Sequence, residues 1–315
     1  MPTWTGATNN NWNTASNWDT NAVPTLTTDA IFSNTSNVNC TVDTATAVCR
    51  NLNFNGGTGY TGTINMANSI TVGNSAPADP NQLVTLSSGM NVTGTGAIIT
   101  RANGTTTLTS NGKVWPNEFR LNTVAVATTS TVTMTDNFAV KSLILGPTSV
   151  HSLTMNGAFN FTINGNFTVQ PVGGVGARIV ATAGAVTTFI LADTGTWSTT
   201  ATFTSTATSA FGFGPNITIN APGKVVTIGN NCYYGGNGYT GVDTGTLLYT
   251  AGTVVTNGTN PVDDWTFYFL QNDASVGNYI INTKGSANPA ATTTSSTGIN
   301  FNNIDFRAQS VNQGQ

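Results

Sequence analysis

Charged residues are scarce in this sequence, and their scarcity excludes several classes of protein. Only 7% of the 315 residues are Asp, Glu, Lys or Arg, against roughly a quarter in an average globular protein. Nine basic and twelve acidic residues give a net charge of −3, so the chain lacks the basic surface that nucleic-acid binding requires. We therefore expect no nucleic-acid partner. Solubility has to come from neutral Thr, Asn and Ser side chains.

Side chains that catalyse reactions or bind metals are also rare. Glu118 is the single glutamate and His151 the single histidine, which leaves too few ligands for a zinc site. A serine-histidine-aspartate mechanism would have to use His151, and no G-x-S-x-G segment accompanies it. The sequence predicts no metal site, no cofactor and no enzymatic activity.

The three cysteines are Cys40, Cys49 and Cys232, an odd count without the spacing of a metal site. We expect small, buried, apolar thiols. A Cys40–Cys49 disulfide is the alternative, and it would need an oxidising compartment. No apolar run approaches the length of a transmembrane helix, so membrane insertion is not expected.

What the sequence does contain is a series of short alternating segments. Each has four to six residues with apolar side chains at every second position, and Gly, Asn or Ser ends it. In the segment 159–163, Phe159, Phe161 and Ile163 share one face. The pattern predicts an all-β protein. Its loose repeat of around twenty residues favours a β-solenoid, a parallel β-helix-like rod, with antiparallel β-sandwich domains as the alternative.

A glycine-rich segment occurs twice, as GGTGYTG at 56–62 and as GGNGYTG at 235–241. A phosphate-binding loop requires a strand before it and a helix after it. Both copies lie between strand-like segments, so each is interpreted as a corner between strands. Tyr60 and Tyr239 would then lie over these corners.

The first residues are rich in tryptophan. Trp4, Trp12 and Trp18 lie among Asn and Thr residues at a spacing that fits neither a strand nor a helix. The interpretation that we favour is a structural cap over the open end of a stacked β core. A platform for stacking on carbohydrate rings is the alternative.

The composition and the hydrophobic pattern of the sequence suggest three regions. An aromatic N-terminal cap or attachment segment covers 1–37, and solenoid coils cover 38–170. A second β-rich region covers 171–315, where small residues and longer apolar runs suggest oligomerisation or a receptor-facing surface.

One segment combines acids with an aromatic residue. Asp263 and Asp264 precede Trp265, a combination used in sugar-binding sites and, with paired carboxylates, in glycoside cleavage. With Tyr239 they are the candidate glycan contacts. The same residues are also what a polar turn followed by a buried aromatic residue would contain, with no role in sugar binding or catalysis. This is the interpretation that we favour.

Two motifs carry a resemblance to known proteins. The opening motif is W-T-G-x(5)-W-x(5)-W, followed by V-P and D-A-I-F. It resembles an opening motif of the β-helical structural proteins of tailed phages and also of autotransporter-like adhesins. The segment 107–121, TLTSNGKVWPNEFRL, is similar to a repeat of the same phage proteins. Together the two motifs cover roughly the first 125 residues. The matching residues of the opening motif are Trp4, Thr5, Gly6, Trp12, Trp18, Val23, Pro24, Asp29, Ile31 and Phe32.

The resemblance implies a virion structural protein: a tail fibre, a head fibre or a capsid decoration protein. Its partners would be other virion proteins, further copies of the chain in a homotrimer, and host surface polysaccharide. The start Met1-Pro2-Thr3-Trp4 lacks the features of a secretion signal, which favours a virion protein made in the host cytoplasm. The alternatives are a polysaccharide-degrading tailspike that uses Asp263 or Asp264, and a secreted adhesin at a bacterial cell surface.

Overall fold

The structure is a computed structural model, and it describes part of the chain. The described residues are 1–73, 81–101, 104–121, 130–146, 152–170, 178–181, 187–199, 212–213, 216–228, 247–256, 278–281 and 303–305. His151, Cys232 and the candidate glycan contacts Tyr239, Asp263, Asp264 and Trp265 lie outside them.

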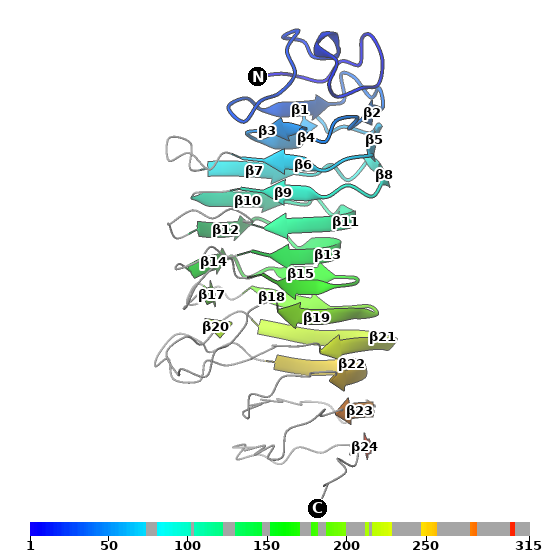
Figure 1. Cartoon of the computed structure of the whole chain (residues 1–315), viewed down its shortest axis with the longest axis vertical. Helices are drawn as coiled ribbons and strands as arrows, with labels where there is room; N and C mark the ends of the chain where they lie inside the picture. The colour runs from blue at the N-terminus through cyan, green and yellow to red at the C-terminus, as the bar shows by residue number, and fades with distance from the viewer. Residues whose placement is uncertain are drawn as a thin grey trace, which may run out of the picture.

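The described chain winds into a β-solenoid whose strands stack along one axis, with the N-terminus at one end (Figure 1). The predicted all-β class is confirmed, and the helix in the described part is the short 3₁₀ turn η1 (Ala15–Asn17). Every pairing between named strands is parallel, so the antiparallel sandwich is wrong. The repeat is longer and less regular than expected: Ile98 pairs with Phe119, 21 residues later, but Arg178 pairs with Gly212, 34 residues later.

The first windings have three sides, with one strand on each side. Sheet 1 takes the first strand of each winding; its eight strands are β1 (Ala30–Ser33), β4 (Leu52–Gly56), β7 (Asn81–Thr85), β10 (Thr105–Thr109), β12 (Ser130–Met134), β14 (Ser152–Asn156), β17 (Arg178–Ala181) and β20 (Gly212–Phe213). Sheet 2 takes the second strand and consists of β2 (Cys40–Thr41), β5 (Thr63–Met66) and β8 (Asn91–Gly94).

Sheet 3 takes the third strand and continues to the end of the described chain. Its strands are β3 (Val48–Cys49), β6 (Ile70–Val72), β9 (Ile98–Thr100), β11 (Val114–Leu121), β13 (Phe138–Leu145), β15 (Asn160–Ile163), β16 (Phe167–Val169), β18 (Thr188–Leu191), β19 (Gly195–Thr199), β21 (Asn216–Ile228), β22 (Leu247–Thr256), β23 (Asn278–Ile281) and β24 (Asn303–Asp305). In β11 the register shifts between Trp115 and Glu118, and the ends of the strand pair with different segments of β13. β13 in turn pairs with both β15 and β16.

The strands after residue 171 continue the same sheets. β17 extends sheet 1 from β14, and β18 extends sheet 3 from β15. Among the described residues, no break in the sheets separates the region 38–170 from the strands that follow it.

The interior is filled by in-register columns of apolar side chains. Phe138 pairs with Phe161, and Phe161 pairs with Phe189, on three successive strands. Their ring centroids are 5.4 Å and 5.7 Å apart, and all three rings are fully buried. The alternation predicted for 159–163 is confirmed, because Phe161 and Ile163 are buried and Phe159 packs against the core from its edge. Stacking identical apolar groups removes them from water and gives each winding its register.

The first glycine-rich segment is a corner, as predicted. It joins β4 to β5, and Gly59 has a φ of +98°, a conformation that suits glycine. The ring of Tyr60 does not lie over the corner but points inward and is fully buried; its hydroxyl donates to the carbonyl of Val38 at 2.8 Å. A Cβ atom on Gly62 would lie 2.5 Å from the Tyr60 ring, so the glycine makes room for the tyrosine. The copy at 235–241 lies outside the described residues.

Candidate functional site

The N-terminal cap closes the first winding with three buried indole rings. Trp4 and Trp12 are fully buried and Trp18 is 2% exposed. The Trp18 ring meets the rings of Trp4 and Trp12 edge-on, at centroid distances of 5.2 Å and 5.0 Å. All three pack against Phe32 of β1. The predicted cap is confirmed. These three rings do not form a carbohydrate platform, because all three are buried.

The cap also pairs with the backbone of the strand edges at this end of the stack. The amide of Trp4 donates to the carbonyl of Ile31 at 2.8 Å, and Ile31 donates to Pro2 at 3.0 Å. On sheet 2, Trp12 donates to the carbonyl of Thr41 at 2.8 Å. An unpaired edge would be a template for pairing with another chain, so the cap ends the stack at β1 and β2.

One buried amide holds the cap loop in shape. The Oδ1 of Asn17 accepts from the amides of Thr8 and Asn9 at 2.9 Å and 3.0 Å, and its Nδ2 donates to Asn9 and to the carbonyl of Asn11. Asn17 is fully buried. Its four hydrogen bonds offset the cost of burying the amide.

The indole nitrogens of the cap are not equivalent. Trp18 Nε1 donates to the carbonyl of Trp12 at 2.9 Å, and Trp4 Nε1 donates to Val38 at 2.9 Å. The buried Nε1 of Trp12 has no hydrogen-bond partner among the residues that the structure describes.

This difference gives a test of the cap. Both Trp18→Phe and Trp12→Phe remove a similar amount of buried apolar surface. Trp18→Phe also removes a buried hydrogen bond, whereas Trp12→Phe removes a donor that has no partner among the described residues. Because a buried polar group left without its partner costs about 1–3 kcal/mol, we expect Trp18→Phe to lower the free energy of unfolding by that much more than Trp12→Phe. Chemical denaturation of the two variants measures the difference. Equal losses would contradict the assignment.

Cys40 and Cys49 are free thiols, and both side chains are fully buried. The expected buried thiols are confirmed for these two residues, and the alternative of a Cys40–Cys49 disulfide is wrong. Burial raises the pKa of each thiol, with a further rise from Asp43 for Cys40 and from Asp29 for Cys49. Buried thiols with a raised pKa are typical of structural cysteines.

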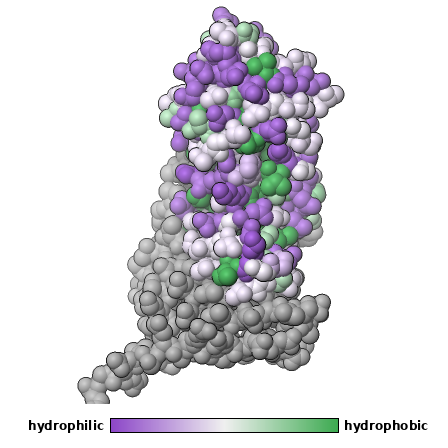
Figure 2. All heavy atoms as spheres, turned by 90° about the vertical axis from the view of Figure 1, so that its right-hand side faces the viewer, coloured by the Kyte–Doolittle hydropathy of each residue, from purple (hydrophilic) through white to green (hydrophobic). Residues whose placement is uncertain are grey.

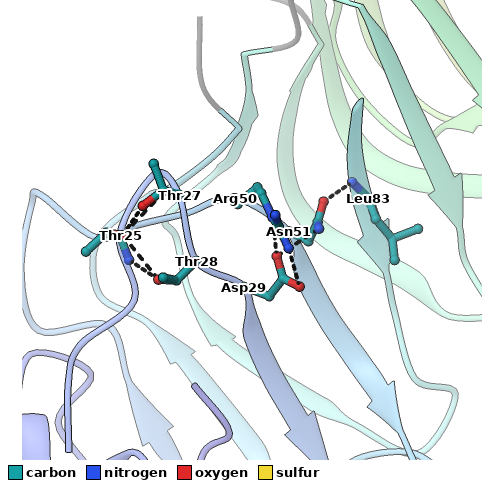
Figure 3. Close-up of polar contacts among 7 residues, drawn as sticks. All are labelled: Thr25, Thr27, Thr28, Asp29, Arg50, Asn51 and Leu83. Carbon is teal, nitrogen blue, oxygen red and sulfur yellow. Dashed lines mark hydrogen bonds and ion pairs between the residues drawn. The ribbon is translucent and has the colours of Figure 1, made fainter. Parts of the chain in front are cut away.

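Asp29 and Arg50, which lie just before β1 and β4, belong to a polar network that links three windings (Figure 3). Asp29 accepts from Arg50 Nε at 2.7 Å and Nη2 at 3.1 Å, and from Asn51 Nδ2 at 2.8 Å. Asn51 Oδ1 in turn accepts from the amide of Leu83 at 2.8 Å. Asp29 belongs to the D-A-I-F motif, and its carboxylate is occupied by neighbours in adjacent windings. The network therefore acts structurally.

The other described aspartates at corners also bind the backbone. Asp43 accepts from the amide of Asn13, and Asp136 accepts from the amides of Ser110 and Asn111. A backbone hydrogen bond from Thr194, followed by the ion pair with Lys224, lowers the pKa of Asp193. That pair is largely exposed, so it contributes little to stability.

The described part of the chain contains no cluster of three or more His, Cys, Asp or Glu residues that could bind a metal. Nor does it contain a helix long and apolar enough to cross a membrane.

One face of the described surface is mostly polar (Figure 2). Figure 2 shows the side at the right of Figure 1, where hydrophilic residues dominate and hydrophobic residues lie in separate small groups. Charged side chains on the outer side of sheet 3 include Glu118, Arg120, Lys141 and Lys224.

The outer side of sheet 1 is different, because its described side chains from β1 to β14 include no charged residue. The pattern T-x-T-x-T occurs at 105–109 and again at 131–135, and the structure places the two segments side by side. Thr105 pairs with Thr131, and Thr131 with Thr154. Thr107 pairs with Thr133. The outward face is therefore a two-dimensional array of hydroxyl and methyl groups, which we call the threonine array. Its members are Thr105, Thr107, Thr109, Thr131, Thr133, Thr135 and Thr154.

The alternating pattern predicted short strands but did not predict the array. The alternating threonines were the available signal. Their alignment depends on pairing across 26 and 23 residues, which the sequence pattern does not reveal. In comparisons with known proteins, no family model, no curated protein and no solved structure matches the chain.

Proposed function

We propose that this chain is a non-enzymatic structural protein of a tailed-phage particle, an appendage such as a tail fibre, head fibre or capsid decoration protein. The observation that carries the proposal is the role of the opening motif. Trp4, Trp12, Trp18 and Phe32 are the residues on which the resemblance to phage β-helical proteins rests, and they pack into one cluster at the end of a β-solenoid. The motif thus occurs in the fold that the resemblance implies.

Rod architecture supports the same role. Parallel strands satisfy the backbone groups of their neighbours along the axis, and the interior is a continuous apolar core. Large hydrophobic side chains are exposed at four separated positions of the described surface: Met1, Val38, Val114 and Val225. A rod with few charged residues and a continuous core suits a protein whose function is to hold a shape. The proposal includes a homotrimer, contacts with other virion proteins, and contacts with host polysaccharide.

The test is direct detection on particles. Antibodies raised against the purified chain should label one position on phage particles from lysates of the encoding phage, viewed by immunogold electron microscopy. Mass spectrometry of the gradient-purified particles should detect the chain. Recovery from bacterial surface fractions, with none in particles, would overturn the proposal in favour of a cell-surface adhesin. Release of reducing ends from host polysaccharide by the purified chain would overturn the non-enzymatic part.

A further inference from the structure

The threonine array lies on the outer side of sheet 1, on strands β10, β12 and β14, which are stacked at the left of Figure 1. One row of the array crosses the strands through Thr105, Thr131 and Thr154, and a second row crosses through Thr107 and Thr133. Neighbouring strands are ~4.8 Å apart, and alternate residues of one strand are ~6.6 Å apart. Identical groups therefore repeat at regular distances in two directions.

The side chains of these two rows are partly exposed to solvent. Thr105, Thr107, Thr131, Thr133 and Thr154 make no side-chain hydrogen bond to the described residues. In a third row, Thr109 and Thr135 are hydrogen-bonded to each other at 2.7 Å. Threonine is stiff about χ1, so little side-chain entropy is lost when such a row binds.

The shape and size of the surface decide between partners. Ligand pockets for small molecules are concave, whereas this array is on the outer side of a sheet. The six strands of sheet 1 from β1 to β14, with about five residues each, cover about 480 Å² at the spacings of a β-sheet, and the three strands of the array cover about half of that area. A stable protein interface takes about 800 Å² from each partner. A second copy of the chain is therefore a poor fit to this surface. The outward side chains of the described strands β1 to β14 include no aromatic ring on which a sugar could stack.

We propose that the threonine array binds the surface of ice. Water molecules in ice form a rigid lattice of tetrahedral hydrogen bonds about 2.8 Å long, so second-neighbour oxygens are about 4.5 Å apart. This distance is close to the ~4.8 Å between neighbouring strands of the array. Each threonine supplies a hydroxyl that can donate and accept hydrogen bonds and a methyl group that fills the space between water molecules. The absence of charge from the described outer face matters, because a charged group would keep its own hydration shell. The inference needs only the fold, and it does not depend on the proposed role in a phage particle.

The experiment measures ice growth with the full-length chain. The purified protein should slow ice recrystallisation and should produce faceted crystals in a nanolitre osmometer. Thr133→Tyr places a ring in the middle of the array and should abolish both effects. Thr162→Tyr is the matched control, because Thr162 is a half-buried, outward-facing residue on β15 of sheet 3, and this variant should keep both effects.

A second variant tests the proposal in case Thr133→Tyr does not fold. Thr107→Lys adds length and charge without a ring, and it should also abolish both effects while circular dichroism and the melting temperature stay at the values of Thr162→Tyr. A native chain that leaves ice growth unchanged relative to serum albumin would overturn the proposal. Full activity in folded Thr133→Tyr or in folded Thr107→Lys would overturn it as well.

Discussion

Phe161→Ala is expected to lower the free energy of unfolding by about 3–5 kcal/mol, the usual range for deleting a buried phenylalanine ring. Phe161 is fully buried between Phe138 and Phe189, which lie on the two neighbouring windings. Its loss would remove ring contacts on both sides and leave a cavity in a core that cannot easily close, because the spacing of the windings is set by the backbone hydrogen bonds of the sheet.

The control for this prediction is the adjacent residue. Thr162→Ala changes an outward-facing, half-buried side chain on the same strand, and its effect should stay within about 0.5 kcal/mol. Denaturant unfolding measures both variants. Hydrogen exchange should show the added opening in Phe161→Ala on β13, β15 and β18, because each winding of a solenoid contacts only its neighbours. Similar losses in the two variants would contradict the assignment of the inner face.

Deletion of residues 2–20 is expected to convert the chain into concentration-dependent, end-to-end assemblies. The deletion removes the strand-edge partners of Ile31 and Thr41, namely the backbone groups of Pro2, Trp4, Asn10 and Trp12. It also uncovers the ring of Phe32, which now packs against the three indole rings. An open parallel edge next to an exposed aromatic surface is a template for further strands. Light scattering coupled to size-exclusion chromatography, over a range of concentrations, measures the mass.

The control places a charged side chain on β1, the strand whose edge the deletion opens. Ile31 is outward-facing and half-buried on β1, and Ile31→Lys in the shortened chain should restore the mass distribution of the full-length chain, because lysine on an edge strand opposes strand addition. If the shortened chain already has the mass distribution of the full-length chain, the cap does not protect the edge.

Much of the fold could be predicted from local patterns. Alternation at 159–163 predicted the buried face on which Phe161 lies, and the sequence GGTGYTG predicted a corner instead of a phosphate site. The tryptophan-rich start predicted a cap. The inward direction of Tyr60 was not predicted, because it depends on the space that Gly62 leaves inside the winding. The free state of Cys40 and Cys49 was predicted, whereas their disulfide alternative was wrong.

The candidate glycan contacts stay predictions, because Tyr239, Asp263, Asp264 and Trp265 lie outside the described residues. The link between Asp29 and Arg50 could not be predicted, since the two residues are separated by the whole of the first winding. The same reason applies to the threonine array, whose rows combine residues from three windings.

The sequence by itself determined that this chain forms short strands with one apolar face, that glycine turns them at corners, and that tryptophans cover one end. These properties follow from side-chain alternation and backbone preference, which act over a few residues. The tertiary structure alone decided which strands are neighbours. The distance between paired residues varies from 21 to 34 positions, because the loops at the corners differ in length, and only the stacking of apolar side chains in the core selects the register.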